Sequence, residues 1–332
     1  MGWSRGSPCA LGERSDPGEQ GEQGEYGKEG AGMSGSRVGF IGLGNMGGRI
    51  TRRIVDGGHP VLGFDLDASR AAAVGATPAA SIAEVVEGSD VVLLSLPDSK
   101  AVEAVVLGDG GVLAASRTGQ VVVDLSTAAP SSTVKLHAAL AERGVEYLDA
   151  GVSGGAAAAE KGTLTIMAGG SKAALERLDA LFGTFAAKVF HMGDSGAGHT
   201  AKLLNNFLNA VSLAATAEVM VAGRKAGLDL KVLLDVLNAS SGVNFATLNR
   251  FPRIIEGDYL EGGLTGALMM KDVVLYVDHL HTLGVPSLNA SGPLASFGLA
   301  NGTGYADMIS NRVVDAIGDI SGGVRLYDEP QS

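Results

Sequence analysis

GAGHTAKLLNNFLNAVSLAATAEVMVAG, residues 196–223, is the stretch that sets the organisation of this chain. Residues 199–222 form a run of 24 without Gly or Pro, which at a rise of ~1.5 Å per residue predicts a helix about 36 Å long. Gly223 and Gly227 follow the run, as is typical of a helix end. Asparagines and a glutamate interrupt its apolar pattern, which excludes a membrane span. The stretch therefore predicts one long helix within a folded core.

Lys202 lies in the first turns of this predicted helix. Asn206 follows four residues later, so both side chains project from one face. A lysine between leucines, braced by an amide, has two interpretations. It is either a surface residue whose ammonium reaches solvent from a buried helix, or a catalytic residue with a perturbed pKa. The sequence on either side of the helix decides between them.

A strand, a glycine-rich turn, a helix and a second strand are predicted at residues 37–65. The turn GLGNMG has the GxGxxG spacing, and Asp65 stands 18 positions after Gly47, at the tip of the second strand. In a Rossmann fold the first glycine, here Gly42, permits a tight turn, and the second, Gly44, lets the backbone approach a pyrophosphate. The third lets helix and strand pack closely, and the helix N-terminus faces the phosphate charge. This context favours a dinucleotide site over a glycine-rich turn without a ligand.

Apolar runs alternate with helix-compatible segments as far as residue 195. They predict further strands at residues 90–95, 120–124, 146–150, 163–168 and 188–191, with a helix opening at residue 130. This alternation is typical of a doubly wound α/β sheet. Later in the chain only helical patterns recur, at residues 232–237, 265–283, 288–300 and 306–317. The expected fold is an α/β Rossmann domain (37–195) joined by the long helix to an all-α C-terminal domain (196–328).

Residues 1–36 differ in composition from the rest of the chain. Gly, Glu, Gln and Ser dominate them, and the single Trp and the single Cys both lie here. This composition predicts a disordered N-terminal extension. The segment lacks the apolar central region of a signal peptide, and we suggest Met33 as the natural start of translation. With no export signal and no disulfide, the predicted location is cytoplasmic.

The charge and the metal-binding residue types narrow the range of partners. A net charge of −11 counts against a nucleic-acid or anionic-membrane partner. One cysteine excludes a Cys-based metal site, and the six histidines are scattered. His279 and His281 stand two apart, which on a helix directs them to different faces. We therefore expect no metal ion.

Five motifs, in order along residues 38–319, resemble those of the β-hydroxyacid dehydrogenases, the family of 3-hydroxyisobutyrate dehydrogenase. They are GFIGLGNMG (39–47), DLSTAAP (124–130), GVSGG with KGTLTIMAGG (151–170), GAGHTAKLLNN (196–206) and MKDVVL (270–275). The resemblance implies a Rossmann domain joined by a long helix to a helical domain that binds substrate and usually dimerises. A homodimer or homotetramer is the corresponding expectation.

The resemblance also implies roles for individual residues. It makes Lys202 the catalytic lysine and Asn206 its supporting amide. Ser153, Gly154 and Gly155 match the loop that binds the substrate carboxylate. The cofactor contacts implied by the resemblance and by the GxGxxG pattern are Gly42, Gly44, Asn45, Met46, Gly47, Asp65, Leu96, Pro97, Thr127 and Lys271.

Asp278, two turns after Lys271, is a further candidate for the substrate pocket, with a solvated or capping role as the alternative. Two positions depart from the family pattern. Gly151 stands where the family usually has Pro, and Ala158 where it usually has Gly, so an extra methyl changes the space beside the carboxylate loop. Imine-reducing relatives have replaced the lysine that this chain keeps. 6-Phosphogluconate dehydrogenases share the GAGH run but have His where Asn205 stands, and a larger second domain with a basic phosphate site.

Oxidation of an alcohol removes a hydride from carbon and a proton from oxygen, and the protein must supply a base for the proton. For a lysine this requires a pKa lowered from ~10.4 toward ~7–8. We expect three causes: burial among Leu203, Leu204 and Phe207, the charge of Lys271, and the charge of the oxidised nicotinamide.

Asp65 predicts NAD as the cofactor, because its carboxylate can accept hydrogen bonds from the adenosine ribose and would repel a 2′-phosphate. Arg70 is expected on the outer face of the following helix. Because its side chain is long enough to reach a 2′-phosphate, use of NADP is left open. The predicted function is NAD-dependent hydride transfer with a small carboxylate substrate, a 3-hydroxy acid similar to 3-hydroxyisobutyrate. The alternatives are an NADP-dependent semialdehyde or imine reductase of the same fold, and a non-catalytic dinucleotide-binding scaffold.

Overall fold

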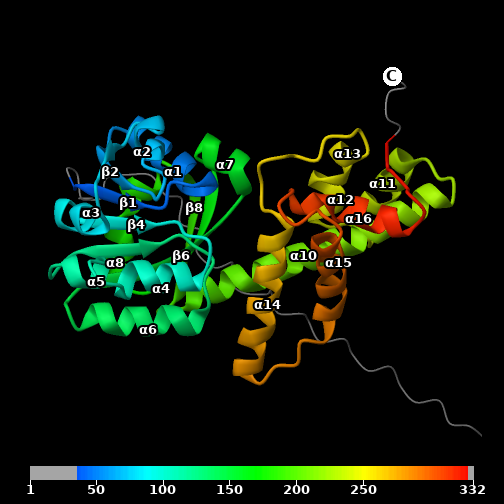
Figure 1. Cartoon of the computed structure of the whole chain (residues 1–332). Helices are drawn as coiled ribbons and strands as arrows, with labels where there is room; N and C mark the ends of the chain where they lie inside the picture. Colours follow the sequence, from blue (N-terminus) through cyan, green and yellow to red (C-terminus); the bar gives the residue numbers. More distant parts are fainter. Residues whose placement is uncertain (1–35, 328–332) are drawn as a thin grey trace, which may run out of the picture.

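A computed structural model describes residues 36–327 (Figure 1). The predicted N-terminal extension lies outside this range except for its last residue, and so does the suggested start at Met33. Within the range, a sheet with helices on both faces is followed by a long helix and a cluster of helices. The predicted fold class is confirmed.

Eight strands form one sheet in the order β3-β2-β1-β4-β5-β6-β7-β8. All neighbouring pairs are parallel except β6 and β7. The strands are β1 (Val38–Ile41), β2 (Val61–Phe64), β3 (Thr77–Pro78), β4 (Val91–Leu94), β5 (Val121–Asp124), β6 (Glu146–Ser153), β7 (Leu164–Gly169) and β8 (Ala186–Gly193). The two-residue β3 was not predicted, because an exposed Thr-Pro pair carries no apolar signal.

Alternate residues of each central strand face opposite layers of helices. In β4, Val91 and Leu93 belong to one apolar cluster, and Val92 and Leu94 to the other. This two-sided burial explains why the strand is a continuous apolar run. The helices of this part are α1 (Asn45–Asp56), α2 (Ser69–Ala73), α3 (Ile82–Gly88), α4 (Ser99–Leu107), α5 (Val112–Ala115), α6 (Pro130–Ala141), α7 (Gly155–Lys161), α8 (Lys172–Arg177) and α9 (Asp179–Phe182).

The long predicted helix is α10 (Ala197–Lys225), 29 residues long and preceded by Gly196 in the left-handed region at φ 92°. From Phe207 onward its buried residues pack against the remaining helices, which lie beyond the sheet in Figure 1. These are α11 (Leu230–Asn238), α12 (Phe245–Asn249), α13 (Phe251–Ile254), α14 (Gly266–Leu283), η1 (Leu288–Ala290), α15 (Ser291–Gly302), η2 (Ser310–Arg312) and α16 (Val313–Ile320). No helix within residues 36–327 has both the length and the apolar character needed to cross a membrane.

The helical part differs from the expectation in two places. Helices α12 and α13 were missed, because each is one turn long and shows no helical period. Asn244 starts α12 through a capping box with Thr247. The helix expected from residue 306 begins instead at Ser310 in η2, after turns and an isolated bridge between Thr265 and Ile309.

Candidate active site

The carboxyl ends of the parallel strands meet α10 and α14 at one edge of the sheet. The register places Ile41 beside Leu94 and Leu94 beside Asp124, so the loops after β1, β4 and β5 lie together. Lys271 of α14 reaches two stretches that follow these strands. Its Nζ donates to the carbonyl oxygen of Pro97 at 2.9 Å and to that of Thr127 at 3.1 Å. Three of the predicted cofactor residues are thus in contact at one place.

The glycine-rich turn has the shape that a dinucleotide needs. A Cβ on Gly42 would lie 2.4 Å from the carbonyl oxygen of Ser95, and a Cβ on Gly47 would lie 1.9 Å from that of Gly42. Both positions therefore require glycine. At Gly44 the nearest atom to such a Cβ is Nη1 of Arg70, 3.6 Å away. The backbone is thus open there, at the glycine that a pyrophosphate approaches in Rossmann folds.

The next two residues of the motif begin α1, whose N-terminus has no side-chain cap among the described residues. Asn45 Nδ2 donates to the carbonyl oxygen of Gly262 at 2.7 Å, which ties the loop before α14 to the glycine-rich turn. Met46 is half-buried and packs against the apolar cluster of the sheet. The uncapped amides at this end of α1 suit a phosphate.

Asp65 follows β2 and lies next to the turn, as predicted. Its Oδ2 accepts from the backbone N–H of Leu43 at 2.7 Å, and its Oδ1 accepts from that of Asp67 at 2.9 Å. The expectation for Arg70 was wrong. Its guanidinium turns back from α2, with Nη1 3.8 Å from Asp65 Oδ2 and Nε 3.3 Å from Asp67 Oδ2. A cation therefore stands beside the carboxylate predicted to bind the ribose, and Arg70 lines a groove of about 600 Å³ together with Arg49, Arg52 and Arg53.

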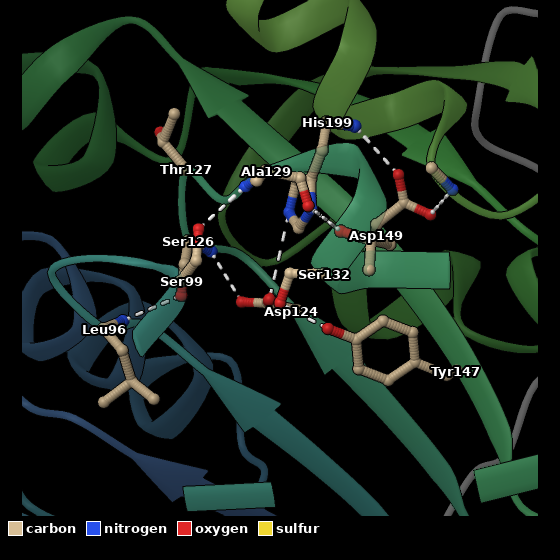
Figure 2. Close-up of polar contacts among 12 residues, drawn as sticks. Leu96, Ser99, Asp124, Ser126, Thr127, Ala129, Ser132, Tyr147, Asp149 and His199 are labelled. Carbon is tan, nitrogen blue, oxygen red and sulfur yellow. Dashed lines mark hydrogen bonds and ion pairs between the residues drawn. The ribbon is translucent and has the colours of Figure 1, made fainter. Parts of the chain in front are cut away.

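Leu96 packs against the glycine-rich turn, because a Cβ added to Gly42 would lie 3.0 Å from Leu96 Cδ2. Its backbone N–H donates to Ser126 Oγ at 2.9 Å (Figure 2). This bond links the stretch after β4 to the loop after β5, where Thr127 lies. The two walls of the predicted cofactor cleft are thus fixed to each other.

Lys202 is half-buried on α10, facing β6 and α14. A Cβ on Gly151 would lie 2.6 Å from the Cβ of Lys202, so the lysine stem occupies the space that a side chain at residue 151 would need. Burial lowers the pKa of Lys202 from its ordinary 10.5 to about 8; Asp272 raises this pKa and Lys271 lowers it. The expected effects of burial and of Lys271 on the Lys202 pKa are both present.

Asn206 is held by a carboxylate that the sequence analysis missed. Its Nδ2 donates to Asp272 Oδ2 at 2.5 Å, and Asp272 Oδ1 lies 3.2 Å from Lys271 Nζ. Asp272 is 1% exposed. A signal was available, because Asp272 shares the buried stripe of α14 with Met269 and Val273 at helical spacing.

Asp278, the acid singled out on this helix, is exposed, and its backbone carbonyl accepts from the hydroxyl of Thr282. Within residues 36–327, no hydrogen bond or ion pair joins its carboxylate to Lys202, Asn206 or Ser153. Its place in the substrate pocket stays a prediction.

The predicted carboxylate loop follows the end of β6. Gly154 and Gly155 have φ of 126° and 69°, which favours glycine at both positions. A Cβ on Gly154 would lie 2.6 Å from the Cβ of Ala158, so the methyl group noted as a departure does pack against this loop. Ser153 is half-buried, and its Oγ makes no hydrogen bond within the described part of the chain. The loop therefore has a free hydroxyl on a tight glycine turn.

Two family models match consecutive parts of the sequence. Residues 37–193 match the NAD binding domain of 6-phosphogluconate dehydrogenase, and residues 196–311 match the NAD-binding region of NADP-dependent 3-hydroxyisobutyrate dehydrogenase. A 2-(hydroxymethyl)glutarate dehydrogenase of Eubacterium barkeri is 37% identical over 277 residues, which cover 82% of this chain and 92% of that protein. The chain belongs to the β-hydroxyacid dehydrogenases.

Other β-hydroxyacid dehydrogenases are similar over the same length. The NAD-dependent L-serine dehydrogenase of Pseudomonas aeruginosa is 40% identical over 281 residues, covering 82% of this chain and 94% of that protein. The structure of Mycobacterium tuberculosis 3-hydroxyisobutyrate dehydrogenase with L-serine has a TM-score of 0.78 at 32% identity, covering 85% of this chain and 99% of that one. An imine reductase from Pseudomonas sp., 19% identical with a TM-score of 0.56, shares the fold.

Proposed function

We propose that this chain is an NAD-dependent dehydrogenase of small 3-hydroxy acids, with Lys202 as the general acid and base. The observation that carries the proposal is the environment of Lys202. A half-buried lysine with a pKa of about 8 lies on α10, next to a buried carboxylate and a second lysine. Catalytic acids and bases have pKa values near the working pH, and burial is a usual way to reach them.

The nicotinamide, when bound, accepts or donates the hydride. The protein then has to manage the proton on the substrate oxygen. Neutral Lys202 takes this proton during oxidation and returns it during reduction. Asn206, fixed by Asp272, orients the substrate hydroxyl beside the neutral amine of Lys202. Lys271 holds the loops after β4 and β5 together, and its charge disfavours the protonated form of Lys202.

The substrate class follows from the carboxylate loop and from the relatives. A hydroxyl from Ser153 and the amides of Gly154 and Gly155 form a small nest of the kind that binds anions. The three relatives are named for hydroxymethylglutarate, L-serine and 3-hydroxyisobutyrate, each with a hydroxymethyl group on the carbon next to a carboxylate. We infer a substrate of this shape. Asp278 remains a candidate for the far side of the pocket.

The test is a spectrophotometric assay of NAD and NADP with a panel of 3-hydroxy acids and with cyclic imines. We expect NAD to be reduced with at least one 3-hydroxy acid. Lys202→Ala should lower kcat by ~10²–10⁴-fold with nearly unchanged cofactor affinity, and Asn206→Ala should lower it less. Reaction with imines alone would support an imine reductase. Binding of NAD without turnover of any panel member would support the non-catalytic scaffold.

The assembly is a proposal of its own. Several apolar side chains are exposed on α10, α11 and α12: Leu208 at 66%, Val232 at 58%, Val236 at 55%, Phe245 at 59% and Leu248 at 54%. Apolar surface of this kind marks a protein contact. We infer a homodimer or homotetramer formed through the helical domain (196–328), separate from the dinucleotide-binding domain (37–195). Light scattering after gel filtration tests it, and a monomer at micromolar concentration would contradict it. Location in the cytoplasm stays a prediction.

A further inference from the structure

Five fully buried polar side chains form a cluster beneath the first turn of α10 (Figure 2). They are Asp124, Thr133, Tyr147, Asp149 and His199, each 0% exposed. None of them has a part in the proton transfer proposed above. Buried polar groups are stable only when they are paired, so the partners within this Asp124–His199 cluster indicate what it holds together.

Asp149 of β6 anchors the start of α10. Its Oδ1 accepts from the backbone N–H of Gly196 at 2.8 Å, and its Oδ2 accepts from that of His199 at 2.8 Å. The first amides of a helix have no partner within the helix, and a carboxylate there is also favoured by the helix dipole. The helix lies so close to the sheet that a Cβ on Gly198 would be 2.4 Å from the carbonyl oxygen of Asp149. The first turn of α10 is thus fixed against β6.

The side chain of His199 contacts two other elements. Its Nδ1 lies 2.7 Å from Thr133 Oγ1, and its Nε2 lies 4.0 Å from Asp124 Oδ2. Nε2 has no hydrogen-bond partner within the described residues. Thr133 Oγ1 also donates to the carbonyl oxygen of Ala129, at 3.3 Å. The ring is therefore held by its hydrogen bond with Thr133, and its Nε2 faces the Asp124 carboxylate.

Asp124 in turn organises the loop on the cofactor side. It is the last residue of β5, and its Oδ1 accepts from the backbone N–H of Ser126 at 3.0 Å. Its Oδ2 accepts from the hydroxyl of Tyr147 at 2.9 Å. The next residue of the loop, Thr127, accepts from Lys271 through its carbonyl oxygen. The loop that contacts Lys271 is thus held by the same carboxylate that faces His199.

We propose that His199 is a positioning residue: its ring, hydrogen-bonded to Thr133 and facing Asp124, keeps the helix turn carrying Lys202 in register with the loop at residues 125–127. Lys202 follows His199 by three residues, about one helical turn. A displacement of about 1 Å at a proton-transferring group is enough to lower a rate strongly. The inference rests on the proposed role of Lys202.

The test compares two substitutions of His199. Leucine fills the space but has no polar atom, whereas the amide of glutamine can hydrogen-bond Thr133 and present a polar group to Asp124. We expect His199→Leu to lower kcat roughly tenfold or more, with KM for the hydroxy acid changed less than about twofold, and His199→Gln to recover most of the activity. Rates are measured well below the melting temperature of each variant, so that a loss of folded protein does not lower the measured kcat.

A second readout does not depend on catalysis. Hydrogen exchange of the amides in residues 197–202, followed by mass spectrometry, should be faster in His199→Leu than in the unaltered protein and His199→Gln. Thr133→Val removes the hydrogen bond of the ring and should act in the same direction, with a loss of kcat of about threefold. Thr51→Val is the matched control, because Thr51 is equally buried in α1 and its hydroxyl has no partner within the described residues.

Equal kcat in His199→Leu and the unaltered protein would overturn the proposal, and so would a glutamine variant as impaired as the leucine variant. If His199→Leu yields no folded protein, Thr133→Val decides, and unchanged exchange and kcat in that variant refute the positioning role. Should Lys202→Ala instead keep full activity, the proposed function fails. The exchange data then still report separately whether His199 anchors the helix.

Discussion

The pKa of Lys202 gives a sharp prediction for the pH dependence of the reaction. The role proposed for Lys202 requires the neutral lysine for oxidation of a hydroxy acid, and the pKa of this group is about 8. At pH 7 roughly one molecule in ten then has a neutral base, against about three in ten thousand for a lysine at 10.5, a gain of about 300-fold. We expect kcat/KM for oxidation to rise with pH and level off above about 8. The reverse reaction needs protonated Lys202 and should fall above the same pH.

Substitutions of two residues near Lys202 should move the midpoint of this pH dependence in opposite directions. Asp272 raises the pKa of Lys202 and Lys271 lowers it. Asp272→Asn should therefore shift the midpoint to lower pH, and Lys271→Met should shift it to higher pH. The assay measures kcat/KM from pH 6 to 10 for both oxidation and reduction. Lys202→Ala is the control, which should lack this pH dependence. A pH dependence of kcat/KM that is unchanged by both substitutions would assign the titration to another group and refute the reasoning.

The same pKa shift has a consequence for stability. The folded protein disfavours the protonated lysine, so the penalty is complete below pH 8 and disappears as the pH rises toward the unfolded value of 10.5. Its upper limit is on the order of 3 kcal/mol. Lys202→Met should therefore unfold at a higher temperature than the unaltered protein at pH 7, with the difference shrinking toward pH 10.5. A pH-independent difference in calorimetry would contradict this.

Three further predictions concern cofactor, substrate and packing. The unaltered enzyme should prefer NAD to NADP by at least about tenfold in kcat/KM. Asp65→Asn should reduce this preference by raising kcat/KM with NADP. Arg70→Ala should increase it, because the guanidinium beside Asp65 is the nearest cation for a 2′-phosphate. Methyl esters of the substrate should mainly raise KM in steady-state assays, and an ester used as well as the acid would show that the carboxylate is not recognised. Gly151→Ala should lower kcat roughly tenfold, because the new methyl group would displace the stem of Lys202; an unchanged kcat would show that the stem can move without loss.

The backbone of the fold could be predicted because its signals are local. The apolar run at residues 91–94 is buried on both faces, which few structures other than a central parallel strand provide. The glycines at 42 and 47 stand where a neighbouring carbonyl oxygen excludes any side chain. Patterns of this kind are set by neighbours close in sequence or by one adjacent strand.

The site was harder to predict where long side chains decide it. Arg70 lies on a surface helix, but its guanidinium reaches back over several bonds to Asp65, and helical periodicity does not describe that path. The acid that binds Asn206 is Asp272, whose partner is 66 residues away in the sequence. Choosing it over Asp278 requires knowing how α10 and α14 cross. Only the apolar stripe of α14 offered a hint.

The ammonium of Lys271 belongs to the helical part of the chain, yet it is tethered to carbonyl oxygens of the sheet part at Pro97 and Thr127. Burial is the largest cause of the lowered pKa of Lys202, and part of that burial is the contact of its stem with Gly151 of the sheet part; the ammonium of Lys271 lowers the same pKa further. The strength of the base is therefore a property of two segments in contact, and neither segment has it alone. Separating them would return the lysine toward its solution basicity and lower its neutral fraction at pH 7 by as much as about 300-fold. The base proposed at Lys202 is therefore available only while the sheet part and the helical part are in contact.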